Sequence, residues 1–151
     1  MKKFKLTSEF IVDISGVKLF RIKALIEFGN VKAGDLGGYI EKEENLSHMG
    51  DAWVFGNARV SGNAQVSGDA QVFGDARVSG DKDYAYAHGF GSCNRTTTFF
   101  RLKDGDVGVR CGCFYGTLAQ FRDKVCETHG ETKKAQEYLM LADLMEIRFK
   151  N

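Results

Sequence analysis

The chain has 151 residues, enough for one folded domain with small terminal additions. Its 21 Lys and Arg residues nearly balance 20 Asp and Glu residues, and the formal charge of +1 excludes a global attraction to nucleic acid or to anionic membranes. We therefore expect neither of these partners, and any anion must be bound by a local group of cations. Ser8, Glu9 and Asp13 interrupt the beginning of the chain, where a signal peptide would be apolar, so we expect a cytoplasmic protein.

Residues 1–36 are expected to form an N-terminal β cap. The run from Phe10 to Leu25 reads FIVDISGVKLFRIKAL, which predicts two strands joined by a turn at Asp13 to Gly16. The segment GDLGG, from Gly34 to Gly38, lacks the Lys-Ser/Thr pair of a phosphate-binding P-loop and indicates turns instead. Such a cap would protect the first strands of the following repeat from water and from other strands.

A six-residue pattern, G-[D/N]-A-x-V-x, dominates the middle of the chain and is clearest from Val54 to Gly80. Its Ala and Val are two residues apart, so both face the same way in an extended chain, while the Gly-Asx pair supplies a turn. Phe and Arg return only every eighteen residues. Three hexads then form one coil, in which each residue lies ~4.8 Å below the residue eighteen positions later. This predicts that Phe55 stacks on Phe73 and Arg59 on Arg77.

The tract resembles the hexapeptide-repeat superfamily. That resemblance implies a left-handed parallel β-helix, and the expected fold class is therefore mainly β, with about three triangular coils over residues 37–92. Tyr84 and Phe90 continue the phase of the valines, and Ile40 and Leu46 continue the phase of the alanines, which sets these limits.

Residues 93–151 lose the repeat and are expected to form a β-hairpin followed by two helices, a ββαα module. Asp104-Gly105 is a hairpin-turn signal between two β-rich runs. Thr117 and Gln120 have the spacing of a capping box, so a helix should begin there and run to about Glu127. The second helix should extend from Thr132 to Arg148, with one apolar face.

Stacking sorts the outward side chains of the tract into columns, and two columns are candidate binding surfaces. Trp53, Phe55 and Phe73 would form an aromatic face too large to stay exposed on a monomer. Either the terminal segments of the same chain cover it, or it forms a protein or oligomer interface. The guanidinium groups of Arg59 and Arg77 would repel each other, which indicates an anionic ligand or a neighbouring carboxylate such as Asp75.

The cysteines and histidines offer a weaker candidate site. Cys111 and Cys113 face one way on a strand, and Cys126 and His129 lie about one helical turn apart, so a four-ligand zinc site is sterically conceivable. The simpler interpretation is that all four cysteines are free thiols, some packed as small core residues. We therefore expect no metal and no cofactor.

Nearly the whole chain resembles a group of small proteins encoded by phages and prophages. The resemblance rests on RIKALIEFGNVKAGDLGGYIEKEENLS, on the GDAWVFGNARV repeats and on the tail CGCFYGTLAQFRDKV with its later THG. The group is mostly of unknown role, so no catalytic residue is implied. The resemblance to hexapeptide-repeat proteins, which are commonly trimers, implies a homo-oligomer, a trimer or dimer, and a phage-encoded protein would act in the host cytoplasm. It would inhibit a host defence system without catalysis, in the manner of anti-CRISPR proteins, by blocking a defence protein or sequestering a nucleotide signal.

Two other functions fit the same sequence. Acyltransferases of the hexapeptide-repeat superfamily use a His to deprotonate the acceptor, and His88 is the candidate for that role. A structural component of the virion is the third option. Zinc-binding members of the superfamily use three histidines, and His48, His88 and His129 do not suit that arrangement because His129 belongs to the helical tail.

Overall fold

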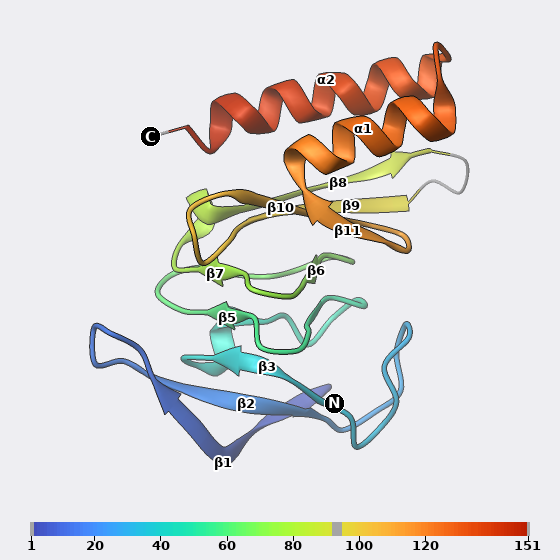
Figure 1. Cartoon of the computed structure of the whole chain (residues 1–151). Coiled ribbons are helices and arrows are strands. Elements are labelled where there is room, and N and C mark those ends of the chain that lie inside the picture. Colours follow the sequence, from blue (N-terminus) through green and yellow to red (C-terminus); the bar gives the residue numbers. More distant parts are fainter. Residues whose placement is uncertain (1, 92–94, 151) are drawn as a thin grey trace.

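The computed structural model describes residues 2–91 and 95–150, and its elements are stacked along one long axis (Figure 1). The strands are β1 (Phe4–Val12), β2 (Lys18–Ala24), β3 (Leu36–Ile40), β4 (Trp53–Val54), β5 (Arg59–Val60), β6 (Gln71–Val72), β7 (Arg77–Val78), β8 (Tyr84–Phe90), β9 (Arg95–Arg101), β10 (Val107–Cys111) and β11 (Phe114–Thr117). Two short 3-10 helices, η1 (Glu43–Asn45) and η2 (Asp81–Asp83), interrupt them, and the helices α1 (Leu118–His129) and α2 (Lys133–Arg148) follow.

The described strands form three sheets. A mixed five-stranded sheet has the order β1-β2-β3-β5-β7, an antiparallel four-stranded sheet has the order β11-β10-β9-β8, and β4 pairs with β6 in parallel. The N-terminal hairpin therefore lies at one end of the repeat tract, and the antiparallel sheet with its two helices lies at the other (Figure 1).

The prediction of a left-handed parallel β-helix with about three triangular coils is wrong. In the part of the chain that the structure describes, parallel pairing is confined to β3-β5-β7, to β4-β6 and to one bridge, and no continuous solenoid sheet forms. The expected last coil is replaced by β8, which pairs antiparallel with β9. The physical reason is local: Tyr86 stands where the next turn glycine would fall, so the chain stays extended through Tyr84–Phe90.

The eighteen-residue stacking inside the tract is confirmed. Trp53 lies beside Gln71 and Arg59 beside Arg77 in parallel register, and the rings of Phe55 and Phe73 are 5.4 Å apart. The preceding turn is longer, because β3 pairs with β5 at an offset of twenty residues. The expected phase of Ile40 and Leu46 is therefore wrong: both pair with valines.

The extra length lies after η1. The chain takes seven steps from Leu46 to Trp53, whereas their partners Val66 and Gln71 are five steps apart. Met49 lies in this longer segment and is 80% exposed. The additional two residues thus form an outward loop and leave the stacked strands in register.

Two apolar cores lie on opposite sides of the antiparallel sheet. The first fills the repeat tract with its inward Ala and Val side chains and includes Phe4, Ile22 and Phe100. The second lies between the sheet and the helices and includes Phe99 and Phe121. Phe99 and Phe100 are neighbours on β9 and point to opposite faces, as successive residues of a strand do.

The C-terminal hairpin and both helices are confirmed, although β8 and β11 enlarge the expected two-stranded part to four strands. Thr117 and Gln120 form the capping box at the start of α1, and Gly130 follows the helix at a φ of 59°. Thr132 caps α2 by accepting a hydrogen bond from the backbone N–H of Ala135. Among the described residues, neither helix combines the length and the apolar composition needed to cross a membrane.

A buried lysine, Lys3, lies at the N-terminal end of the repeat tract. The ammonium group of Lys3 donates hydrogen bonds to the carbonyl oxygens of Gly50 and Ala52, at 3.2 and 2.7 Å, and lies 4.6 Å from the centre of the Phe28 ring. Lys3 is only 1% exposed. Burial lowers the pKa of its amine to about 8, although Asp51 attracts the charged form.

The stability of the protein should therefore rise with pH above 8. In the unfolded chain the Lys3 amine titrates near 10.5, so between pH 8 and that value the unfolded chain binds more protons than the folded one. We expect wild type to gain about 2 kcal/mol relative to Lys3→Met between pH 8 and about pH 9.5, measured by urea unfolding. The comparison cancels the titration of other groups, and parallel pH curves for the two proteins would show that the amine is solvated.

Candidate anion-binding site

The aromatic side of the tract is covered by the chain itself. Trp53 is 1% exposed, and its ring lies 5.2 Å from that of Phe28 and 6.3 Å from that of Phe4, both in edge contact. For Trp53, the first interpretation of the aromatic face therefore holds: a segment near the N-terminus of the same chain covers the side chain. Trp53 is a core residue and offers no surface to a partner.

Phe55 and Phe73 are half-buried against the other end of the chain. The ring of Phe73 lies 5.0 Å from that of Tyr115, and the guanidinium of Arg110 lies over it at 4.7 Å. Arg110 is held in place by Gln71, whose side-chain oxygen accepts from its Nε at 3.1 Å. Segments from both termini thus contact the predicted aromatic face, which weakens the argument for a protein or oligomer interface there.

The arginine column is differently placed. The register of β5 and β7 sets Arg59 beside Arg77, and the buried Nε of Arg59 has no hydrogen-bond partner among the described residues. Within residues 2–91 and 95–150, the one hydrogen bond that the Arg77 side chain donates goes to the neighbouring carbonyl oxygen of Ala76, at 2.9 Å. Burial and then the charge of Arg59 lower the pKa of Arg77, against the attraction of Asp75. An anion between these guanidinium groups would relieve both effects.

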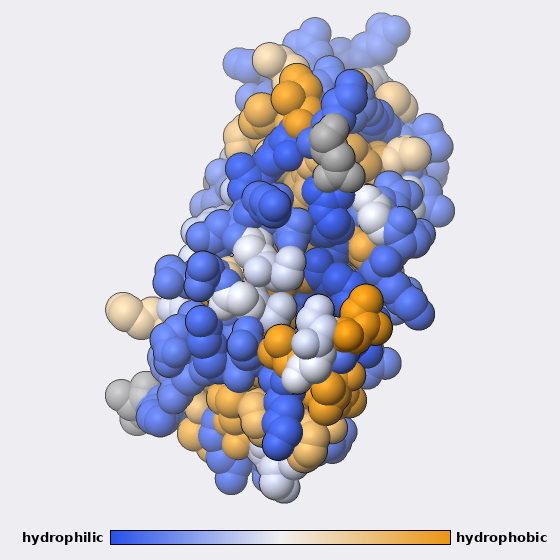
Figure 2. Space-filling view, turned by 90° about the vertical axis from the view of Figure 1, so that its left-hand side faces the viewer, coloured by the Kyte–Doolittle hydropathy of each residue, from blue (hydrophilic) through white to orange (hydrophobic). Residues whose placement is uncertain are grey.

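The column opens into a basic groove formed by two adjoining cavities of about 600 and 580 Å³. They share Arg77, Ser79 and Lys103. Seven cationic side chains of the described residues line this groove: Arg59, Arg77, Lys82, Arg101, Lys103, Arg148 and Lys150. The β1–β2 turn, the ends of β5 and β7 and the β9–β10 turn all lie on the left-hand side of Figure 1. Figure 2 shows that side, where hydrophilic residues cover most of the middle.

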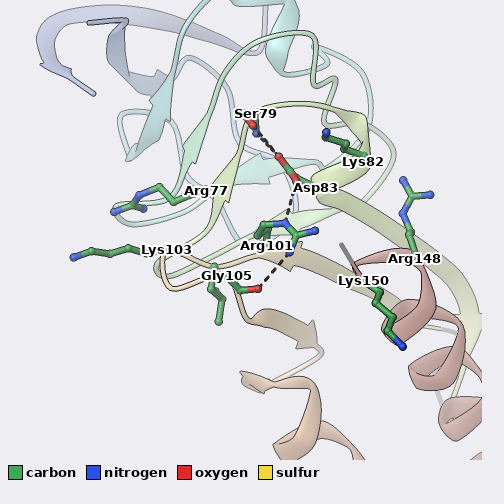
Figure 3. A pocket seen from close by; sticks show the side chains of 10 residues that line it. Arg77, Ser79, Lys82, Asp83, Arg101, Lys103, Gly105, Arg148 and Lys150 are labelled. Carbon is green, nitrogen blue, oxygen red and sulfur yellow. Dashed lines mark hydrogen bonds and ion pairs between the residues drawn. The ribbon is translucent and has the colours of Figure 1, made fainter. Parts of the chain in front are cut away.

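The two carboxylates that line the groove are already engaged. Asp83 accepts hydrogen bonds from the backbone and hydroxyl of Ser79 and from Arg101, at 2.8 to 3.1 Å (Figure 3). Burial alone would raise the pKa of Asp83, but these contacts outweigh it and hold the pKa below its usual value. Asp13 accepts from the backbone of Ser15 and Val17 within its own turn. Neither carboxylate neutralises the lysines of the groove.

Two of the arginines build the wall of the groove. Arg101 also donates to the carbonyl oxygens of Gly105 and Phe149, and Arg148 donates to those of Asp81 and Tyr84. In Figure 3, Arg77 and Lys103 extend in one direction from the Asp83–Arg101 pair, while Lys82 and Arg148 lie on its other side. The wall is therefore fixed, and the remaining cations are available to a ligand.

No aromatic ring is among the described residues that line the groove. A nucleotide base would need an aromatic ring beside Arg59 and Arg77 on which to stack, and the described residues that line the two cavities include none. Tyr39 pairs with Arg59 in the sheet, but it is buried and lies under Arg21 at 4.4 Å. The groove can thus recognise charge but offers no stacking surface for a base.

The proposed metal and acyl-transfer residues are not assembled. The described residues contain no group of three or more His, Cys, Asp or Glu side chains that could hold a metal ion. Cys111, Cys113 and His129 line one cleft, whereas Cys126 is exposed and does not line it. Cys93 lies outside the described residues. His88 is exposed on β8, where its Nδ1 lies 2.7 Å from the hydroxyl of Thr96, and so belongs to the antiparallel sheet.

The tract matches a known family of repeats. The model of the YdcK Beta solenoid repeat matches residues 52–69 and 70–81, which are the stacked hexads that carry the arginine column. This match supports a β-solenoid-like repeat in that part of the chain. No curated protein matches the chain.

Proposed function

We propose that the protein acts by binding, without catalysis, and that its ligand is a phosphate-bearing anion held in the basic groove. The observation that carries this proposal is the pairing of Arg59 with Arg77, together with the buried Nε of Arg59, which has no hydrogen-bond partner in the described part of the chain. Charge-assisted hydrogen bonds from guanidinium to phosphate oxygens are among the strong polar contacts of proteins. A phosphate group bridging the two side chains would supply the missing acceptors.

The distribution of charge supports the same ligand. Seven cations and two carboxylates give the groove a net charge of +5 in a chain of formal charge +1, so all other residues together carry −4. A cleft lined by one sign of charge concentrates oppositely charged ligands. Although the net charge of the chain is close to zero, the groove has a positive electrostatic field that favours ligands with several negative charges.

Lack of a stacking surface favours recognition through phosphates. A nucleotide signal with two or more phosphates fits this chemistry, because each phosphate can contact a separate cation of the groove. The resemblance to phage-encoded proteins supports the biological role: sequestering such a signal so that a host defence system is not activated. Blocking a defence protein through Trp53, Phe55 and Phe73 is less well supported, because the same chain contacts all three rings.

Calorimetric titration with inorganic pyrophosphate, a cyclic dinucleotide and adenosine tests the proposal. We expect the two phosphate-bearing compounds to bind and adenosine not to bind. Replacing both groove arginines, Arg59→Gln with Arg77→Gln, should weaken binding at least tenfold, since a hydrogen bond to a charged group contributes about 1.5–3 kcal/mol. Arg122→Gln is the matched control, because Arg122 lies on α1 and pairs with Asp143 and Glu146.

Two further measurements test the proposal: the chemical state of the recovered ligand and the effect of salt on the affinity. Ligand recovered from the denatured complex should be chemically intact, and a modified product would instead indicate an enzyme. Affinity should also fall as salt concentration rises, as it does when phosphates are bound by exposed cations. Equal affinities of the double arginine variant and the Arg122 control would remove the basis of the proposal.

A further inference from the structure

A second cleft, of about 330 Å³, lies between the β10–β11 turn and the two helices. It shares no lining residue with the basic groove. Its volume is at the lower end of the range of small-molecule sites, so it suits a ligand of one or two rings. We refer to it as the helix cleft and define it by Phe114 and Cys111 from the sheet, Phe121, Lys124 and Val125 from α1, and Tyr138 from α2.

The floor of the helix cleft is apolar and aromatic. Phe121 and Val125 are 3% and 4% exposed, and Phe114 is half-buried beside them. The ring of Phe121 meets that of Tyr138 edge to face at 5.6 Å and lies 5.8 Å from the ring of Phe114. Aromatic side chains prefer such edge-to-face contacts, so a flat ring inserted here can continue the same packing.

The rim of the helix cleft is basic. Lys124 and His129 lie on the side of α1 that faces it, Arg95 lies at the start of β9, and no carboxylate lines it among the described residues. Lys124 reaches Glu127 only at 3.7 Å, and both side chains of that pair are more than half exposed. Such an exposed pair contributes little and is readily exchanged for another anion.

Cys111 and Tyr138 bring hydrogen-bonding groups to the lining of the cleft. The hydroxyl of Thr97 donates to the sulfur of Cys111 at 3.3 Å, and the hydroxyl of Tyr138 lies 3.7 Å from the same sulfur. Burial raises the pKa of Tyr138, and Cys111 adds to the effect, so this hydroxyl keeps its proton at neutral pH. Tyr138 therefore adds no negative charge that would oppose an anion in the cleft.

We propose that the helix cleft binds a small aromatic carboxylate. The ring lies on Phe114, Phe121 and Val125, and the carboxylate reaches the basic rim at Lys124. The apolar floor favours a ring, and the basic rim, with no carboxylate among the described lining residues, favours a negative charge on the ligand. This site is separate from the basic groove, so the two proposals stand or fail independently.

Titration with indole-3-acetate and with its uncharged amide, followed by protein NMR, tests this proposal. We expect the carboxylate to bind at least tenfold more tightly than the amide, and Lys124→Gln to remove most of that difference. Thr128→Trp, at an exposed position on the rim, should block the cleft and abolish binding of both compounds. Lys134→Gln, an exposed change on α2 outside the cleft, should leave binding unchanged.

The cysteines supply a second measurement in the wild-type protein. Bound indole-3-acetate should slow alkylation of Cys111 and Cys113 by iodoacetamide, while Cys126, which is exposed and does not line the cleft, should react at an unchanged rate. Equal binding of carboxylate and amide, or equal protection of Cys126, would overturn the proposal. So would absence of binding at millimolar ligand.

Discussion

Replacing Trp53 with alanine is expected to lower the free energy of unfolding by about 3–5 kcal/mol. The indole is 1% exposed, and it packs against Phe28 and Phe4, which come from the segments before the repeat tract. Truncation leaves a large cavity between the N-terminal hairpin and the first stacked strands, and neither segment can close it because both are fixed by backbone pairing. Urea unfolding followed by circular dichroism measures the change.

Phe55→Ala is the control for this experiment. Phe55 is half-buried and stacks on Phe73, so its truncation should cost clearly less than that of Trp53. The native mass of the Trp53→Ala protein, measured below its unfolding transition, should equal that of wild type. A loss of stability under about 1 kcal/mol together with a lower native mass would place Trp53 at a subunit interface instead.

The stacking within the tract could be predicted because it depends on local repetition. Equal turns every six residues return the chain to the same position after eighteen, and this alone brings Arg59 beside Arg77 and Phe55 beside Phe73. Hairpin and helix signals at Asp104-Gly105 and Thr117 were also local and are confirmed. Each of these features is decided by residues close together in the chain.

The errors concern where the repeat ends and what covers it. Tyr84 and Phe90 continue the phase of the valines, but Tyr86 takes the place of the turn glycine, and the extended chain pairs with β9 instead. The position of β9 depends on its contacts with both cores, which no local pattern reports. The contact of Phe28 with Trp53 could not be predicted from a local pattern either, because the two residues are distant in sequence.

The candidate site, too, could be predicted only where it depends on the local repeat. Arg59 and Arg77 were found from the repeat, whereas the lysines of the groove were missed. Lys82 follows the tract, Lys103 lies in the β9–β10 turn and Lys150 follows α2, so only the fold brings them to one cleft. The formal charge of +1 could not reveal this cluster of lysines either, because the net charge of a sequence does not say how the charges are distributed over the surface.

Gly62→Ala should destabilise the protein by about 2 kcal/mol more than Gly56→Ala. Both glycines have a φ of 61°, so both substitutions carry the same cost of about 1–2 kcal/mol for a left-handed residue. They differ in space: a Cβ at Gly62 would lie 2.1 Å from the carbonyl oxygen of Ser79, whereas a Cβ at Gly56 meets nothing within 4 Å.

The difference between the two variants therefore measures how tightly successive turns of the tract approach each other. Ser79 also lines the basic groove, so the backbone shift that relieves the contact at Gly62 moves β7 relative to β5 and separates Arg77 from Arg59. We expect Gly62→Ala to weaken pyrophosphate binding while Gly56→Ala leaves it unchanged, in calorimetric titrations of both folded proteins. Equal stability of the two variants would mean that the turns are not in contact at Gly62. The close approach of the two turns would then not explain why Arg59 and Arg77 lie side by side.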